Sequence, residues 1–153
     1  MYEGLRDESR AAQHIMLSFA HGTSLENARS IQQIGLDRAA ALAHSFGSHI
    51  PGAFFAHLLG PPSHPGPGMQ MAYEWGKRHS DMPVLLIGQL PEEVFHALEA
   101  AGLVATQPVP GVPDDYQVPL ETVFYDASYS VVNQHVQWQI VDPYSTRREQ
   151  GLL

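Results

Sequence analysis

The chain has no cysteine, no long apolar run and no apolar N-terminal segment. Without cysteine, its 153 residues can form neither disulfides nor thiolate metal sites. No apolar stretch approaches the roughly 20 residues of a membrane-spanning helix. The first eight residues, Met1 to Glu8, have no apolar core of the signal-peptide kind. We therefore expect no membrane partner, and a protein that is cytoplasmic or secreted by a route without an N-terminal signal peptide.

Basic residues are also scarce. The chain has eight Lys and Arg residues and sixteen Asp and Glu residues, which gives a net charge of −8. Nonspecific binding to nucleic acid needs clustered Lys or Arg that release counterions, and only the short pairs Lys77-Arg78 and Arg147-Arg148 occur. Nonspecific nucleic-acid binding is therefore not expected, although a specific RNA substrate stays open.

Common nucleotide and hydrolase motifs are missing as well. The sequence contains no Gly-x-Gly-x-x-Gly, no Gly-Lys-Ser/Thr and no Gly-x-Ser-x-Gly. Among nine histidines, two close pairs are His44/His49 and His57/His64, and neither has helical ligand spacing or a carboxylate ligand. We therefore expect no metal. His57 and His64 flank the proline-rich segment 60–68 and are candidates to touch a substrate.

The chain does have the length and apolar content of one globular domain. Its 44% hydrophobic residues allow a proper core. Apolar runs and their periodicity predict the following elements in order: strand 15–20, helix 25–34, short helix 39–43, strand 52–56, helix 69–79, strand 83–90, helix 91–101, loop 103–119, strand 121–126 and strand 136–141. We expect a single domain over 1–153, with its core at about 15–141, of the α+β class.

The first strand runs into His21-Gly22-Thr23 and then into a capped helix. Ser24 is a good N-cap and Gly35 a good residue to end the helix. A histidine held between a strand and a helix N-terminus has a fixed position, and the glycine beside it lets a ligand approach the backbone. The alternative is an ordinary turn. The segment 60–68 is likewise open between a lid over a site and a tolerated surface insertion.

Three features occur in order along the chain: His21-Gly22-Thr23, the aromatic strand Gly52-Ala53-Phe54-Phe55-Ala56, and Glu121 ahead of an apolar residue followed by Tyr125-Asp126. This set resembles the ADP-ribosyltransferases of the diphtheria-toxin and poly(ADP-ribose) polymerase branch, over roughly residues 15–141. The resemblance implies an ADP-ribosyltransferase-like fold, with two small, mostly antiparallel sheets flanking an NAD cleft and helices around them.

The resemblance also implies roles for individual residues. His21 would hydrogen-bond the adenine-side ribose of NAD, and the Gly22 backbone would pair with the nicotinamide carboxamide, with Thr23 beside them. Glu121 would be the catalytic carboxylate, and His21 is counted with it as catalytic. The aromatic walls around nicotinamide would be Phe54 and, on the next helix, Tyr73 or Trp75.

The chemistry agrees with these roles. Breaking the nicotinamide–ribose bond creates an oxocarbenium-like transition state, whose positive charge a neighbouring carboxylate stabilises. The same carboxylate can orient a ribose hydroxyl or take a proton from the nucleophile. Stacked aromatic walls hold the departing ring and exclude water.

Two departures from the family pattern matter. Phe54 stands where the family has tyrosine, so stacking survives but the hydrogen bond of the phenol is lost. Pro119 stands two positions before Glu121, so the Gln/Glu-x-Glu signature of arginine-modifying members is missing and arginine is disfavoured as acceptor. Structural alternatives also remain: Glu121 can be a solvated edge charge, and either Phe54 or Phe55 is expected in the core.

The sequence thus predicts an NAD-dependent mono-ADP-ribosyltransferase that transfers ADP-ribose to an unidentified acceptor, with NAD as substrate and no metal. The absence of a second domain favours a bacterial toxin, an effector or a small-molecule-modifying enzyme over a chain-elongating enzyme. The alternatives are an NAD glycohydrolase, an RNA 2′-phosphotransferase, a degenerate domain that binds NAD or ADP-ribose without catalysis, and an acidic immunity or scaffold protein.

Overall fold

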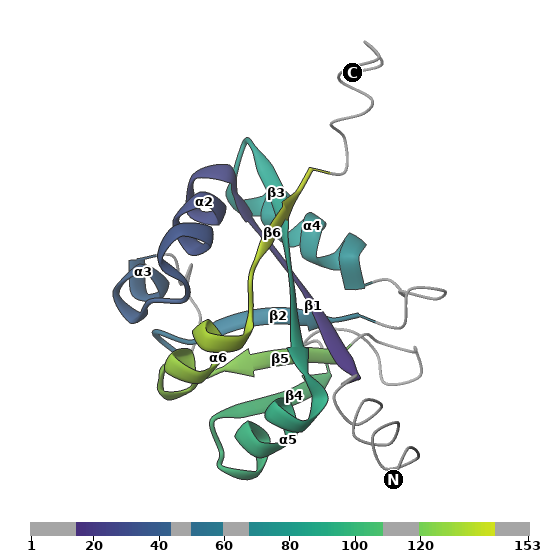
Figure 1. Cartoon of the computed structure of the whole chain (residues 1–153). Helices are drawn as coiled ribbons and strands as arrows, with labels where there is room; N and C mark the ends of the chain where they lie inside the picture. Colours follow the sequence, from purple (N-terminus) through teal and green to yellow (C-terminus); the bar gives the residue numbers. More distant parts are fainter. Residues whose placement is uncertain (1–14, 44–49, 60–67, 109–119, 143–153) are drawn as a thin grey trace, which may run out of the picture.

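The protein is a mixed α/β structure built on one six-stranded antiparallel sheet (Figure 1). The structure is a computed structural model that describes residues 15–43, 50–59, 68–108 and 120–142. Its elements, in chain order, are β1 (Met16–Ser24), α2 (Leu25–Ile34), α3 (Arg38–Ala43), β2 (Phe54–Leu58), α4 (Gly68–His79), β3 (Pro83–Pro91), α5 (Glu92–Ala100), β4 (Val104–Pro108), β5 (Leu120–Phe124), the 3₁₀ turn η1 (Asp126–Ser128), α6 (Tyr129–His135) and β6 (Gln139–Val141).

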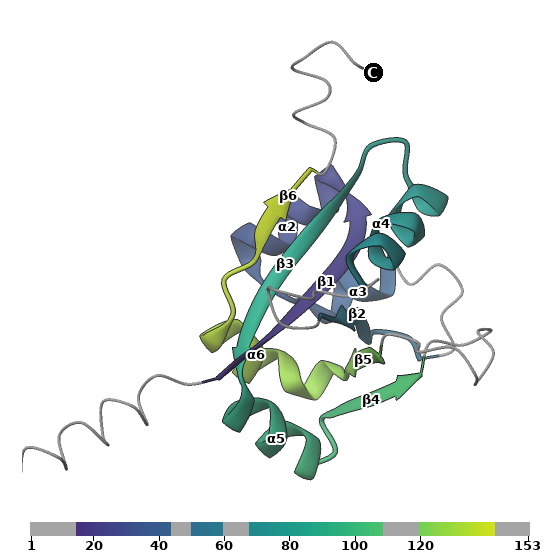
Figure 2. The same ribbon diagram turned by 90° about the vertical axis from the view of Figure 1, so that its right-hand side faces the viewer.

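The strand order is β4-β5-β2-β1-β3-β6, and the sheet consists of two halves. β1 pairs with β3 over nine residue pairs, but with β2 over only two, Phe19↔Leu58 and Ala20↔His57. In both ribbon views β1, β3 and β6 run together while β2, β5 and β4 cross them (Figures 1 and 2). The sequence predicted two small sheets; the structure instead has one sheet whose halves separate beyond Ala20 and His57. We call the place where the two halves separate the fork.

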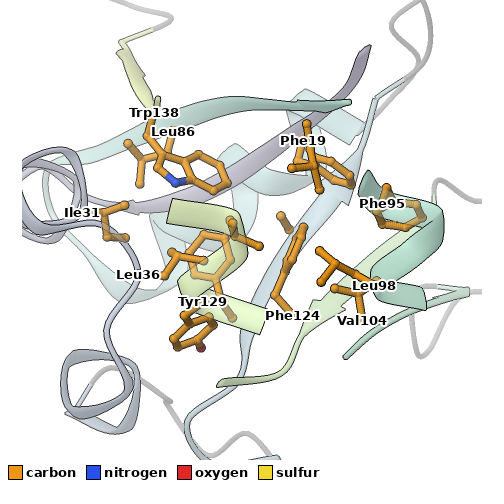
Figure 3. Close-up of a cluster of buried hydrophobic side chains, with 14 of the residues drawn as sticks. Phe19, Ile31, Leu36, Leu86, Phe95, Leu98, Val104, Phe124, Tyr129 and Trp138 are labelled. Atoms are coloured by element: carbon orange, nitrogen blue, oxygen red, sulfur yellow. The ribbon is translucent and has the colours of Figure 1, made fainter. Parts of the chain in front are cut away.

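One face of the sheet carries a large apolar core, and we call it the core face. Side chains of β1, β2, β3 and β5 contribute to it, and α2, α5 and α6 cover it (Figure 3). The ring of Phe19 packs against those of Phe95 and Phe124, and Phe54 packs against Phe124 and Trp138. Alternation along each strand sends every second side chain to this face, which explains the period-two pattern of the strands.

The other face, which we call the α4 face, has a much smaller cluster formed by Ala20, Ala72 and Leu85. Here α4 packs directly on the backbone of β1. A Cβ atom built on Gly22 would lie 1.6 Å from the carbonyl oxygen of Ala72, and one on Gly76 would lie 3.0 Å from the Thr23 nitrogen. Two glycines therefore let helix and strand approach backbone to backbone.

Most predicted elements are confirmed, including both helix ends proposed for α2. Ser24 Oγ accepts a hydrogen bond from the Asn27 N–H, and Gly35 has φ of +79° and donates to Ile31. None of the described helices is long and apolar enough to cross a membrane.

Three predictions about the elements are wrong. First, His21 to Thr23 do not form a link after the strand; they are part of β1, because β3 pairs with them to the end of the strand. Second, part of the predicted loop 103–119 is strand β4, an edge strand on β5 that ends at Pro108, where the missing N–H costs no ladder bond. Third, a helix, α6, follows the turn at Asp126.

Candidate functional site

Three of the predicted residues, His21, Gly22 and Glu121, lie around the fork, and His21 lies where β1 leaves β2. Its Nδ1 lies 2.6 Å from the carbonyl oxygen of Phe55, so Nδ1–H donates to it. In the β1–β2 ladder, Leu59 N–H bonds Ser18 O, so the next bonded pairs would be Ala20 with His57 and then Gly22 with Phe55. The imidazole N–H thus bonds the Phe55 carbonyl, which in a continued ladder would accept from the Gly22 N–H. His21 ends the ladder and opens the fork.

Gly22 contributes its backbone to this opening. Because bonding directions alternate along an antiparallel strand, its N–H and C=O point to the β2 side, beyond the last β1–β2 pair. The sequence predicted that its missing side chain admits a ligand. The structure gives a different reason for the glycine, since α4 occupies the space where a Cβ would lie. The peptide groups, not the missing side chain, face the fork.

Thr23 and Phe54 are taken up by packing inside the protein. Thr23 is 8% exposed, and its hydroxyl accepts a hydrogen bond of 2.8 Å from Asn27, which fixes the start of α2. Phe54 is 6% exposed and lies in the core behind His21, with 4.1 Å between the two ring centroids. Among Phe54 and Phe55, the core residue is therefore Phe54, while Phe55 is half-buried on the α4 face.

Glu121 lies across β2 from His21. It is half-buried on β5, directly opposite His57 on β2 and Gln107 on β4. Two strand spacings of about 4.8 Å separate Ala20, the residue before His21, from Glu121 across β2. Their side chains point to opposite faces: His21 shares the core face with Phe54, whereas Glu121 shares the α4 face with His57 and Ala20.

His57, which the sequence offered only as a possible substrate contact, also lies at the fork. It forms the last β1–β2 pair, with Ala20, and faces Glu121 in the β2–β5 ladder. Its Nδ1 is buried and has no hydrogen-bond partner among the described residues. Burial lowers the pKa of His57 from the usual 6.5, because it disfavours the charged form. The only signal in the sequence was its place beside the proline-rich segment.

The two aromatic candidates of α4 differ in their surroundings. Two positions along a helix correspond to a rotation of about 200°, so Tyr73 and Trp75 lie on different sides of α4. Tyr73 packs against the small cluster of the α4 face, with the Lys77 ammonium 5.9 Å from its ring centroid. Trp75 is 47% exposed and meets the ring of His79 edge-on. They cannot line one side of α4 together.

A hollow of about 610 Å³ opens at the start of α2. Its lining comes from Ser24, Leu25, Glu26, Arg29, Ser30, Gln33 and the 80–82 turn. No predicted site residue lines it. Within the described ranges, no group of three His, Asp or Glu residues lies close enough to hold a metal ion. His44, His49, His64, Pro119 and the pair Arg147-Arg148 lie outside those ranges.

Comparison with known proteins gives no further assignment: no family model, no curated protein and no solved structure matches this chain.

Proposed function

We propose that this chain is an NAD-dependent ADP-ribosyltransferase with an ADP-ribosyltransferase-like fold, which cleaves the nicotinamide–ribose bond and transfers ADP-ribose to an acceptor. The observation that carries the proposal is the fork. The fork brings together residues from early and late in the sequence: His21 and Gly22 lie on one side of β2, and Glu121 lies on the other. Both side chains are only half-buried and so are within reach of a ligand.

The local chemistry of the fork suits a dinucleotide. The Gly22 peptide offers a donor and an acceptor in one plane, which is what a carboxamide requires. The His21 imidazole donates Nδ1–H to Phe55, so Nε2 carries the lone pair and can accept from a ribose hydroxyl. Glu121 supplies negative charge on the far side, where the ribose carbon becomes positive. We expect NAD to bind at the fork and to contact all three groups.

The packing of Phe54 bears on the rival hypothesis of a degenerate binding domain. That hypothesis rested on phenylalanine in place of the family's tyrosine. In the structure the ring is enclosed by Phe124 and Trp138, where an apolar ring packs without an unpaired hydroxyl. Phenylalanine at this position therefore has a packing reason and does not argue for lost activity.

A second candidate, an NAD glycohydrolase, is favoured by one observation. His57 places a neutral imidazole beside Glu121, and such a base can activate water. The two functions share NAD cleavage and differ in the acceptor alone, so both are tested first by the same reaction.

The test is release of nicotinamide from NAD by the purified chain. Glu121→Gln keeps the shape and removes the charge, so we expect release to fall about 100-fold or more. The matched control is Glu99→Gln on the exposed end of α5, which should leave the rate unchanged. His21→Ala should weaken NAD binding by roughly tenfold, the loss of about one hydrogen bond, whereas His135→Ala on α6 should not. An inactive wild type, or equal rates for both glutamate variants, would disprove the proposal.

A further inference from the structure

The fork holds a second chemical group beside the predicted carboxylate. His57 and Glu121 are direct cross-strand partners in the non-hydrogen-bonded position, because the backbone groups of His57 bond towards β1. Side chains in such pairs lie closest, with Cβ atoms about 4.5 to 5.5 Å apart. A carboxylate and an imidazole thus lie side by side on the α4 face of the sheet, at the fork.

Apart from that carboxylate, the neighbours of His57 identified among the described residues are small. Its β1 neighbour is Ala20, and the α4 residue that covers its Cβ is Gly68, whose own Cβ would lie 3.6 Å away. Of the described titratable and charged groups on β1, β5 and the first turn of α4, only Glu121 faces it. Burial lowers the pKa of His57, so the imidazole is neutral near pH 7 and has a lone pair to accept a proton.

The buried Nδ1 has no partner among the described residues, which is costly for a polar atom unless something satisfies it. The acceptor that the ladder places directly opposite His57 is the Glu121 carboxylate. A hydrogen bond from Nδ1–H to Glu121, formed in the substrate complex, would fix the tautomer and leave the lone pair on Nε2. Without substrate, the donor and acceptor of such catalytic hydrogen bonds are often too far apart to bond. The tautomer is our assignment from these contacts.

We infer that His57 is the base that takes the proton from a hydroxyl acceptor, and that this enzyme transfers ADP-ribose to hydroxyl groups. This inference rests on the proposed transferase function. A hydroxyl is a poor nucleophile until its proton leaves, and a neutral imidazole is a better base near pH 7 than a carboxylate with its usual pKa of about 4.

The step balances as follows. The bond between the ribose carbon and the nicotinamide nitrogen breaks, and its electron pair leaves with neutral nicotinamide. The acceptor oxygen forms a bond to that carbon, and its proton passes to Nε2 of His57. The imidazolium formed is stabilised by the Glu121 carboxylate and later loses its proton to solvent, so NAD and an alcohol give an O-linked ADP-ribose, nicotinamide and one proton.

The first test compares nicotinamide release by wild type and by His57→Gln between pH 5 and 8. In the wild type the rate should rise with pH through one ionisation below 6.5 and then level off. In His57→Gln we expect a rate at least about 100-fold lower at pH 7.5. This rate should no longer rise with pH below 6.5, and the NAD affinity should stay within about twofold of wild type. His135→Gln is the matched control and should keep both the wild-type rate and its rise with pH below 6.5.

The second test separates proton transfer from structure. Free imidazole should restore release by His57→Ala but not by Glu121→Gln. With methanol added, methyl-ADP-ribose should form beside the ADP-ribose made with water, which distinguishes the two sources of the hydroxyl. If His57→Gln keeps the wild-type rate and its rise with pH while Glu121→Gln is inactive, the base is not His57 and only this inference fails. If the wild type releases no nicotinamide with either acceptor, both proposals fail.

Discussion

The two faces of the sheet are built in different ways. The core face buries sixteen residues in one cluster, whereas the α4 face buries three small or aliphatic ones. The core face has interlocking aromatic rings; the α4 face has a helix resting on glycine and, beyond it, the row His57–Glu121–Gln107. The fold therefore depends mainly on one face, which leaves the other able to hold partly buried polar groups at the fork.

The largest effect should come from breaking the core face. Phe124 is 1% exposed and packs against Phe19 and Phe54. Phe124→Ala should lower the free energy of unfolding by about 3 to 5 kcal/mol through lost burial and the cavity left behind. Urea unfolding followed by circular dichroism measures this. Trp75→Ala, on the exposed side of α4, is the control, and a loss of similar size there would contradict the comparison.

The next largest effect should come from the backbone contact on the α4 face. In Gly22→Ala the new methyl would overlap the Ala72 carbonyl, so α4 must move away from β1. We expect a loss of about 2 to 3 kcal/mol, the cost of overpacking, together with loss of nicotinamide release. Gly76→Ala meets its neighbours only at 3.0 Å and gains helix propensity. If Gly76→Ala costs as much as Gly22→Ala, the contact is not specific to the strand.

A smaller effect on the free energy of unfolding should appear at acidic pH, and it tests the polar residues of the α4 face, of which His57 is one. The pKa of His57 is lowered in the folded state by burial. Below pH 6.5 the unfolded chain takes up this proton first, so the contribution of His57 to stability is full above 6.5 and is lost as pH falls through the folded pKa. Unfolding of His57→Gln should therefore lose less stability than wild type between pH 7 and 5. An identical pH dependence would show that the imidazole is not desolvated.

The smallest effect should come from the surface outside both layers. Arg38 and Asp126 form an ion pair of 2.8 Å with both side chains largely exposed. Exposed pairs of this kind contribute little, so Arg38→Ala should change the free energy of unfolding by no more than about 0.5 kcal/mol. The measurement should be repeated in 1 M NaCl, where the difference should shrink further. A larger loss would mean that Arg38 supports the core face through its aliphatic stem.

Local patterns in the sequence determined most of the elements. The apolar run of β3 and the residues at the two ends of α2 predicted those elements, because each depends on the residues of its own segment. β4 and α6 were missed for the opposite reason. β4 exists because β5 offers it an edge to pair with, and the short α6 is held by Tyr129 and Val132 in the core.

The candidate site divides in the same manner. The sequence supplied His21, Gly22 and Glu121 as residue types in a recognisable order. It could not show that His21 captures the Phe55 carbonyl, that α4 fills the space at Gly22, or that Phe54 belongs to the core. These are contacts between segments that lie far apart in the sequence, and strand register and helix packing set them.

The sequence by itself determined which chemical groups this protein carries and which segments become strands and helices, because propensity and alternation are local. Only the tertiary structure decided that His57 faces Glu121 and that His21 and Glu121 point to opposite faces of one sheet. A shift of one residue in the β2–β5 register would reverse those faces without changing a single local preference.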